Sequence, residues 1–183
     1  MIPARFYTGI WYAMSMKKLL IATLLPVLVL LLNYVLLSVP ANSALNKDAR
    51  NVGLHTWIHY EYFINPSTLV IDLRDVDSDK STVDVFRALF QVAEEFEGRN
   101  FSKVYLSSKG TKKFYIQGAY FAELGSSYSY QNPMYLLRTF PENTYSTNGT
   151  KAFSTWTGGV LGVLGKQMDD VNELAQNWFI EDL

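Results

Sequence analysis

The stretch LVIDL, residues 69–73, is a short run of branched apolar side chains around one acid. Such a run is typical of a strand that is buried on both faces of a sheet. A polar connection follows at 75–81, and apolar residues then recur at helical spacing through 83–96. Ser81 and Asp84 have the spacing of a capping box, which marks the start of a helix. The sequence therefore predicts a buried strand, a polar connection and an amphipathic helix, in that order.

The rest of the chain adds elements of both kinds. Further predicted elements are a strand or the end of a helix at 57–63, a turn at 65–67, strands at 104–107, 113–117 and 134–140 with a turn at 109–112, a short helix at 119–124, a loop at 141–155 and a long helix from 157 onward. We expect a single α/β or α+β domain, in which helices pack on a mixed β-sheet of about four or five strands.

An apolar segment precedes this domain. Residues 19–39 read LLIATLLPVLVLLLNYVLLSV, 21 residues without a charge. A helix of that length reaches about 30 Å, the thickness of the hydrocarbon core of a bilayer. The residues MKK at 16–18 resemble the basic region of an export signal. Two interpretations stay open, an uncleaved membrane anchor and a signal peptide cut after Ala41 or Ala44. The length favours the anchor, because the apolar part of a signal peptide usually has about 7–15 residues.

Charges beside this segment predict its orientation. Lysine and arginine are slightly more frequent before the segment than soon after it, which favours a cytoplasmic N-terminus. We predict a cytoplasmic N-terminus over 1–18, with Met16 as a second candidate start, and a membrane partner for 19–39. A stalk is predicted over 40–55 and an extracytoplasmic globular domain over 56–183. The protein would then be a single-pass protein of the inner (plasma) membrane, or a secreted or periplasmic one if the signal is cleaved.

The composition excludes several classes of function. The net charge is −1, so no overall field attracts nucleic acid, and no nucleic-acid partner is predicted. The chain has no cysteine, which excludes disulfides, thiolate metal sites and a cysteine nucleophile. About 140 residues follow the apolar segment, which is enough for one domain with its own core. No motif points to a cofactor.

The stretch GGVLGVLGKQ, residues 158–167, resembles a phosphate-binding loop but does not match it. A Walker A loop requires glycine at the position of Val160 and a serine or threonine at the position of Gln167. We therefore predict no nucleotide. Gly158 and Gly162 instead lie on one side of the predicted helix, where small residues let another backbone approach. Close packing inside the domain is the favoured interpretation, and contact with a partner or a membrane surface is the alternative.

Aromatic residues are concentrated between 114 and 140, and several belong to a predicted loop over 126–135. Tyrosine in loops makes good contact surfaces, because it buries a large area with little loss of rotamer freedom. The candidate binding residues are Tyr128, Tyr130, Gln131 and Asn132, with Gly158 and Gly162 of the last helix. The leading hypothesis is a non-catalytic binding or protein-interaction role in the cell envelope. The alternative interpretation places these tyrosines in strands, with their hydroxyl groups at the rim.

Acidic residues at the end of the 69–73 strand carry the alternative function, a metal-assisted hydrolase. Asp72, Asp75 and Asp77 could supply oxygen ligands to a hard cation. The run that begins at Asp75 imitates a calcium loop, but its sixth and twelfth positions lack the required glycine and glutamate. His55 and His59 could join a metal only if they converge, and a strand would hold them about 13 Å apart. The sequence contains no recognisable nucleophile motif.

Overall fold

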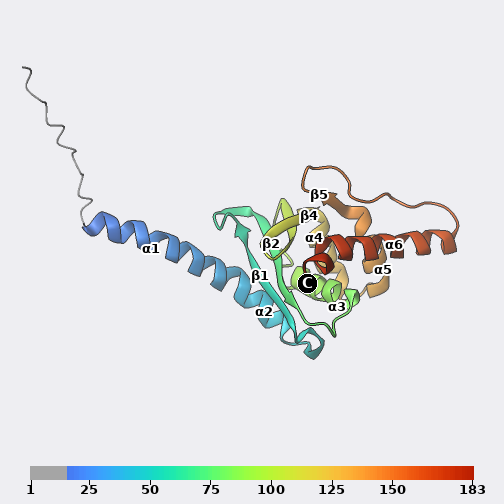
Figure 1. Cartoon of the computed structure of the whole chain (residues 1–183), viewed down its shortest axis with the longest axis horizontal. Coiled ribbons are helices and arrows are strands. Elements are labelled where there is room, and N and C mark those ends of the chain that lie inside the picture. The colour runs from blue at the N-terminus through green and yellow to red at the C-terminus, as the bar shows by residue number, and fades with distance from the viewer. Residues whose placement is uncertain (1–15) are drawn as a thin grey trace, which may run out of the picture.

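The computed structural model describes residues 16–183, and within them the side chains of 21–159 and 162–183. It contains one five-stranded mixed sheet with helices packed on it, in a single domain that follows an N-terminal apolar helix (Figure 1). The predicted fold class is therefore confirmed. The predicted cytoplasmic N-terminus falls mostly on residues 1–15, which lie outside the described residues.

The strands are neighbours in the sheet in the order in which they occur in the chain. The pair β2–β3 is parallel and is connected through α3, whereas the other three pairs are antiparallel. The strands are β1 (Leu54–Glu61), β2 (Asn65–Val76), β3 (Lys103–Ser108), β4 (Thr111–Gln117) and β5 (Thr144–Ser146). The predicted strands at 69–73, 104–107 and 113–117 thus exist, each with longer bounds. The segment 57–63, predicted as a strand or the end of a helix, lies in β1 up to Glu61.

The helices of the domain gather on one side of the sheet (Figure 1). They are α3 (Thr82–Glu95), α4 (Gly118–Tyr128), α5 (Pro133–Thr139) and α6 (Val160–Trp178), with 3₁₀ turns at Pro141–Asn143 and Ile180–Asp182. The predicted capping box is present at the start of α3: the Ser81 side chain accepts from the Asp84 N–H, and the Asp84 carboxylate accepts from the Ser81 N–H.

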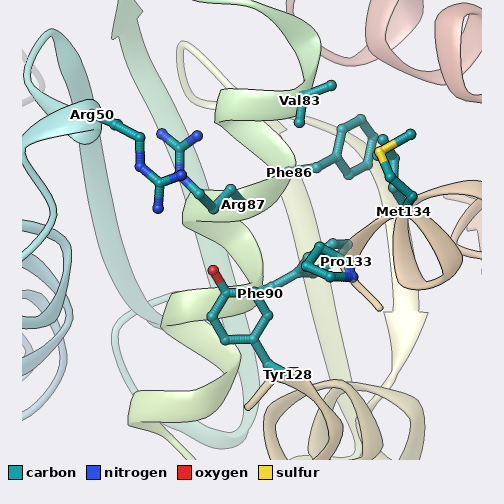
Figure 2. A pocket seen from close by; sticks show the side chains of 9 residues that line it. Arg50, Val83, Phe86, Arg87, Phe90, Tyr128, Pro133 and Met134 are labelled. Carbon is teal, nitrogen blue, oxygen red and sulfur yellow. The ribbon is translucent and has the colours of Figure 1, made fainter. Parts of the chain in front are cut away.

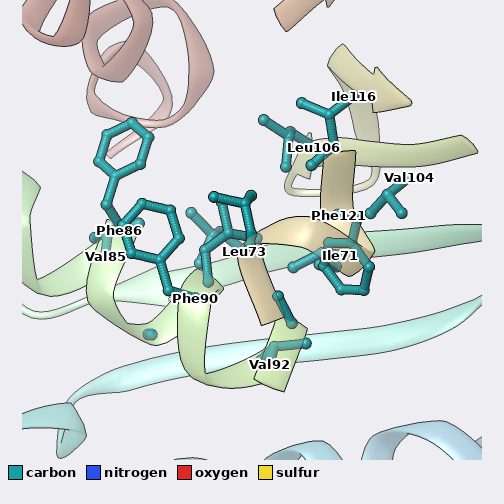
Figure 3. Close-up of a cluster of buried hydrophobic side chains, with 14 of the residues drawn as sticks. Ile71, Leu73, Val85, Phe86, Phe90, Val92, Val104, Leu106, Ile116 and Phe121 are labelled. Carbon is teal, nitrogen blue, oxygen red and sulfur yellow. The ribbon is translucent and has the colours of Figure 1, made fainter. Parts of the chain in front are cut away.

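The core lies between this side of the sheet and the helices. Alternation along the LVIDL stretch sends Leu69, Ile71 and Leu73 into the core, and leaves Val70 and Asp72 on the other face. In Figure 3 side chains of β2, β3 and β4 meet phenylalanines of α3 and α4. All members of LVIDL are buried, as predicted, but Val70 and Asp72 are covered by side chains of the outer face.

Three predicted elements are wrong. The predicted loop at 141–155 contains the 3₁₀ turn Pro141–Asn143 and strand β5. The predicted strand at 134–140 is helix α5, because Asn132 caps the Met134 N–H and Pro133 occupies the first helical turn. The predicted turn at 65–67 belongs to β2, and the chain reverses instead at Tyr62 and Phe63, both with positive φ. The predicted turn at 109–112 is shorter, since β4 already begins at Thr111.

The N-terminal helix has a bare half and a half that is bonded to the sheet. Helix α1 (Met16–Asn33), a π-helical turn (Tyr34–Ser38) and α2 (Val39–Leu45) follow one another directly. Figure 1 shows α1 projecting away from the domain and α2 lying beside β1. The side chains of 21–32 are exposed, except for the half-buried Val29. Among the described residues one helix, Ile21–Leu45, is long and apolar enough to cross a membrane.

Two polar side chains of this helix bond to the free edge of β1. Asn33 Oδ1 accepts from the Tyr60 N–H at 2.9 Å, and Asn33 Nδ2 donates to the Phe63 carbonyl at 2.7 Å. The Ser38 hydroxyl donates to the Ile58 carbonyl at 2.7 Å. A π-helical turn bonds residues five apart, so it helps to place Asn33 and Ser38 on the same side of the helix. An uncovered edge strand can pair with other chains, and these bonds prevent that.

Residues 40–55, predicted as a stalk, comprise most of α2, a 3₁₀ turn (Ala49–Asn51) and the start of β1. Ala41 and Leu45 are buried members of the core cluster, and Asn51 is buried as well. The Asn51 amide donates to the Leu45 carbonyl at 2.9 Å and to Gln91 of α3 at 2.6 Å. This segment therefore packs on the domain, while the predicted boundary between anchor and domain stays a prediction.

Candidate binding surfaces

The predicted aromatic loop at 126–135 is largely helical. Helix α4 continues to Tyr128, and α5 begins at Pro133, so only four residues lie between the two helices. The Tyr128 ring packs on Phe90 of α3, with 6.2 Å between the ring centroids. Tyr130 is 71% exposed, and Gln131 and Asn132 are exposed as well. The structure thus gives Tyr128 a different position from the other candidates, half-buried at the edge of a pocket.

This pocket lies between α3 and α5 and has a volume of about 190 Å³. Figure 2 shows its side chains, with the Tyr128 hydroxyl pointing toward the guanidinium groups of Arg50 and Arg87. The remaining lining is apolar and consists of Val83, Phe86, Phe90, Pro133, Met134 and Leu137. Ligand pockets usually enclose about 300–1,000 Å³, so this one is suited to a single apolar side chain.

The two arginines at the rim already have acidic partners. Arg50 Nη2 lies 2.7 Å from Asp48 Oδ2, and Arg87 Nη1 lies 2.6 Å from Asp84 Oδ1. The hydrogen bond from Arg50 holds the pKa of Asp48 well below its usual range. Hydrogen bonds from the hydroxyl and N–H of Ser81 lower the pKa of Asp84 to about 2. Because both carboxylates remain charged, the rim does not form a strong site for an anion.

A second groove lies on the other side of Met134, between α5 and α6, with a volume of about 560 Å³. Arg138 of α5 donates to Gln167 of α6 at 2.7 Å, and Gln167 donates to Glu142 at 2.7 Å, which fixes the two helices together. The groove is lined by Gln131, Asn132, Met134, Tyr135, Arg138, Leu164 and Met168. We call the side chains of Tyr128, Tyr130, Gln131, Asn132, Met134 and Tyr135, with Leu164 and Met168 of α6, the α5 surface.

The candidate glycines Gly158 and Gly162 lie near and at the start of α6 and are exposed. A Cβ added at either would meet nothing within 4 Å. The favoured interpretation, close packing of this glycine face inside the domain, is therefore wrong. Close packing occurs at Gly118 and Gly125 instead, where a Cβ would clash with the carbonyl oxygens of Phe101 and Ala93. Contact of Gly158 and Gly162 with a partner stays a prediction.

The three aspartates of the metal hypothesis do not converge. Asp72 is buried on the outer face of the sheet, where it pairs with Arg74 at 2.8 Å and accepts from the Gly110 N–H at 3.0 Å. Asp75 is exposed and accepts from the N–H that follows it, and the exposed Asp77 lies beside Gly53. Within the described part of the chain, no group of three or more histidine, cysteine or acidic side chains could hold a metal ion.

The histidines lie toward opposite ends of β1, and only His55 lies opposite one of these acids, Asp75 of β2. His55 is exposed. His59 stacks on Phe63, with ring centroids 4.6 Å apart, and contacts Trp57 at 4.8 Å. Burial lowers the pKa of His59 below its usual value. The expectation that these histidines are partly buried among aromatic residues thus holds for His59 alone.

Sequence reasoning missed one surface, the outer face of the sheet. Its aromatic rings carry cations above them: Lys103 Nζ lies 4.1 Å from the Tyr115 centroid, and Lys112 Nζ lies 4.2 Å from that of Tyr105. Tyr115 also stacks on Tyr145 of β5, with 5.1 Å between the centroids. The signal was the alternation in β3, where Lys103 and Tyr105 occupy one face while Val104 and Leu106 occupy the other.

Comparison of the chain with protein-family models, with curated proteins and with solved structures finds no match.

Proposed function

We propose that this protein is a non-catalytic interaction domain that an uncleaved N-terminal helix holds at the outer side of the plasma membrane. The N-terminal helix carries this proposal, because the same helix that is bare and apolar over 21–32 is bonded to β1 from Asn33 onward. A helix that both projects apolar side chains and completes the domain has two roles, anchor and structural element.

The packing of the π-helical turn and α2 on the domain supports the anchor over the signal peptide. Leu37 is 0% exposed and Ser38 is 1% exposed, and both lie before the cleavage positions suggested by Ala41 and Ala44. Cleavage there would remove Leu37 from the core and Ser38 from the edge of β1. Ala41 is also a buried member of the core cluster, so cleavage after Ala41 or Ala44 would remove it as well. The predicted orientation, with the N-terminus in the cytoplasm, places the domain outside.

The α5 surface supports the interaction role. Met134 is 47% exposed and lines both the pocket and the groove, so the two form one apolar area across α5. Apolar areas with a polar rim are typical of protein interaction sites, and tyrosine is enriched where such sites bind most strongly. Gln131 and Asn132 supply that rim. Residues of the α4–α5 connection and of α5 thus share one groove with Leu164 and Met168 of α6.

The anchor is tested by extracting membranes with carbonate and measuring the intact mass of the retained protein. We expect a membrane-bound chain that still contains residues 19–45. A soluble protein that begins near residue 42 or 45 would show that a signal peptide is cleaved, and would contradict the anchor.

The interaction site is tested by photocrosslinking in intact cells. A crosslinking amino acid replaces Met134 in one variant and the exposed Val52, which lies outside the α5 surface, in the control. We expect an adduct of defined mass with Met134 replaced, its loss when Tyr128→Ala and Tyr130→Ala are added, and no such adduct from position 52. Equal adducts from both positions, or an adduct that survives both tyrosine substitutions, would contradict binding at the α5 surface.

A further inference from the structure

We propose that the domain rests directly on the lipid surface, with the tip of the β1–β2 hairpin, residues 62–64, inserted in the interfacial layer of the membrane. This inference rests on the anchor proposed above, and it adds a lipid contact made by the folded domain itself. Three observations support it: the length of the bare helix, the position of the hairpin tip along that helix, and the side chains at the tip.

The bare part of the helix is too short to cross a bilayer alone. From Ile21 to Leu32 a helix reaches about 18 Å, whereas the hydrocarbon core is about 30 Å thick. The apolar run continues to Val39, but Asn33, Leu37 and Ser38 in that part face the domain and are buried. The side chains on its other side remain apolar and exposed: Tyr34, Val35, Leu36 and Val39. Lipid can cover these side chains only if the membrane surface reaches the domain.

The hairpin tip lies within this same part of the helix. Asn33 Nδ2 donates to the Phe63 carbonyl at 2.7 Å, so the tip is fixed beside residue 33, inside the apolar run. Figure 1 shows the β1–β2 connection reaching along α1, toward the free end of that helix. If lipid covers the helix as far as Val39, it also surrounds residues 62–64.

The side chains of the tip suit that environment. In the described part of the chain no large apolar side chain is more exposed than Tyr62, at 73%, and Ile64, at 72%. Tyr62 and Phe63 have φ values of 51° and 63°, which are unfavourable for residues other than glycine. This turn directs the Phe63 ring back onto Trp57, with centroids 5.3 Å apart, and leaves Tyr62 and Ile64 outside. Tyrosine is enriched at the level of lipid headgroups, where its ring is buried and its hydroxyl is hydrated.

Charge does not drive this contact. Lys112 Nζ lies 4.9 Å from the Tyr62 centroid, but it also forms an ion pair with Glu61. Glu61 thus offsets the charge of Lys112, the cation that lies over the Tyr62 ring. Insertion of Tyr62 and Ile64 should depend on apolar burial, and should occur in neutral as well as in anionic lipid.

The depth of single residues in the membrane can be measured with a fluorophore attached to cysteine. The chain has no cysteine, so each single-cysteine variant carries one label at a known position. The full chain is reconstituted in vesicles of phosphatidylcholine, and separately with phosphatidylglycerol added. An environment-sensitive fluorophore is attached in Ile64→Cys at the tip, in Leu28→Cys in the bare helix, and in Val52→Cys. Val52 is 71% exposed and precedes the other end of β1, roughly 25 Å from the tip along the strand. Quenching by lipids that carry a spin label at a shallow or a deep position reports the depth of each fluorophore.

We expect deep quenching at position 28, shallow quenching with a blue-shifted emission at 64, and neither at 52, in both lipid mixtures. Deep quenching at 28 with equal signals at 64 and 52 would overturn the lipid contact while leaving the anchor intact. Absence of quenching at 28 would overturn the anchor and this inference with it. Quenching at 64 only with phosphatidylglycerol would overturn insertion in favour of adsorption by charge.

Discussion

The first turn of α3 depends on one carboxylate. Asp84 accepts from the Ser81 N–H at 2.9 Å and from the Ser81 hydroxyl at 2.7 Å, and it pairs with Arg87 at 2.6 Å. We predict that Asp84→Ala lowers the free energy of unfolding by about 1 kcal/mol at pH 7, the usual effect of losing a helix cap. Urea unfolding of the full chain in mild detergent, followed by circular dichroism, measures this loss.

The loss of unfolding free energy caused by Asp84→Ala should become smaller as the pH falls. The pKa of Asp84 falls from 3.8 to about 2 on folding, so its contribution is complete above about pH 4 and declines as the pH falls toward 2. The difference in free energy of unfolding between the wild type and Asp84→Ala should therefore shrink as the pH falls from about 4 toward 2. Asp79→Ala is the control, because the Asp79 side chain is 72% exposed and pairs only with its neighbour Lys80. A difference that stays constant with pH would contradict this role of the Asp84 charge.

Two helical glycines should respond in opposite directions to the same substitution. A Cβ at Gly125 of α4 would clash with the Ala93 carbonyl of α3, whereas one at Gly165 of α6 would meet nothing within 4 Å. We predict that Gly125→Ala destabilises the domain by about 1–3 kcal/mol, because α3 and α4 must separate. Gly165→Ala should stabilise it by up to about 1 kcal/mol through helix propensity. Thermal unfolding of both variants measures the pair, and a loss of similar size in both would disprove the close approach of α3 and α4.

The hydrogen bonds between the N-terminal helix and β1 can be tested separately from the apolar character of the helix. Asn33→Leu keeps the helix apolar but leaves the Tyr60 N–H and the Phe63 carbonyl without a partner from the helix. We predict unchanged retention in the membrane, together with faster amide hydrogen exchange at Tyr60. The expected cost is about 1–3 kcal/mol, that of an unsatisfied buried group.

Val35→Leu is the matched control, because Val35 lies in the same part of the helix but is exposed. Exchange at Tyr60 should stay as slow in this variant as in the wild type. If Asn33→Leu also leaves the exchange at Tyr60 unchanged, the bond between the helix and β1 does not protect the strand.

Elements with a long or simple pattern could be predicted from the sequence. The LVIDL strand, α3 with its capping box and the C-terminal helix each follow one period over most of their length. Helix α5 could not, because seven residues contain too few repeats to separate helix from strand. The pair Asn132-Pro133 was its one local signal, since both residues favour a helix start as well as a turn. The reversal at Tyr62 and Phe63 was unpredictable for another reason: it depends on the contacts of Phe63 with Trp57 and His59.

The candidate site was predictable only in part. The sequence identified residues 128–132 by their composition, but not that Tyr128 packs on Phe90 while Leu164 and Met168 of α6 complete the groove. Contacts between segments more than 30 residues apart leave no local pattern. The glycine face of α6 shows the opposite error, because the spacing of Gly158 and Gly162 suggested packing that no neighbouring element provides.

The two proposed contacts lie on different sides of the domain. In Figure 1 the β1–β2 connection extends toward the free end of α1, whereas α5 and α6 lie on the side away from α1. A domain that rests on lipid through residues 62–64 would therefore present the α5 surface away from the membrane. This arrangement leaves the α5 surface accessible to a partner in the surrounding compartment.

The domain should depend on the bonded half of its N-terminal helix for its stability. We compare the chain 33–183, which keeps the bonded half of the helix, with the chain 46–183, which lacks it. The shorter chain loses Leu37, Ala41 and Leu45 from the core and the Asn33 and Ser38 bonds from β1. Loss of one buried leucine typically costs about 2–5 kcal/mol, and whole domains are stable by about 5–15 kcal/mol.

We therefore expect 33–183 to be a folded monomer in mild detergent, and 46–183 to be unfolded or to associate through the edge of β1. Size-exclusion chromatography with light scattering distinguishes these states, and thermal unfolding gives their stability. A monomeric 46–183 with the same midpoint of unfolding as 33–183 would contradict this prediction. It would mean that the helix adds nothing to the domain, and would remove the structural argument against cleavage after Ala41 or Ala44.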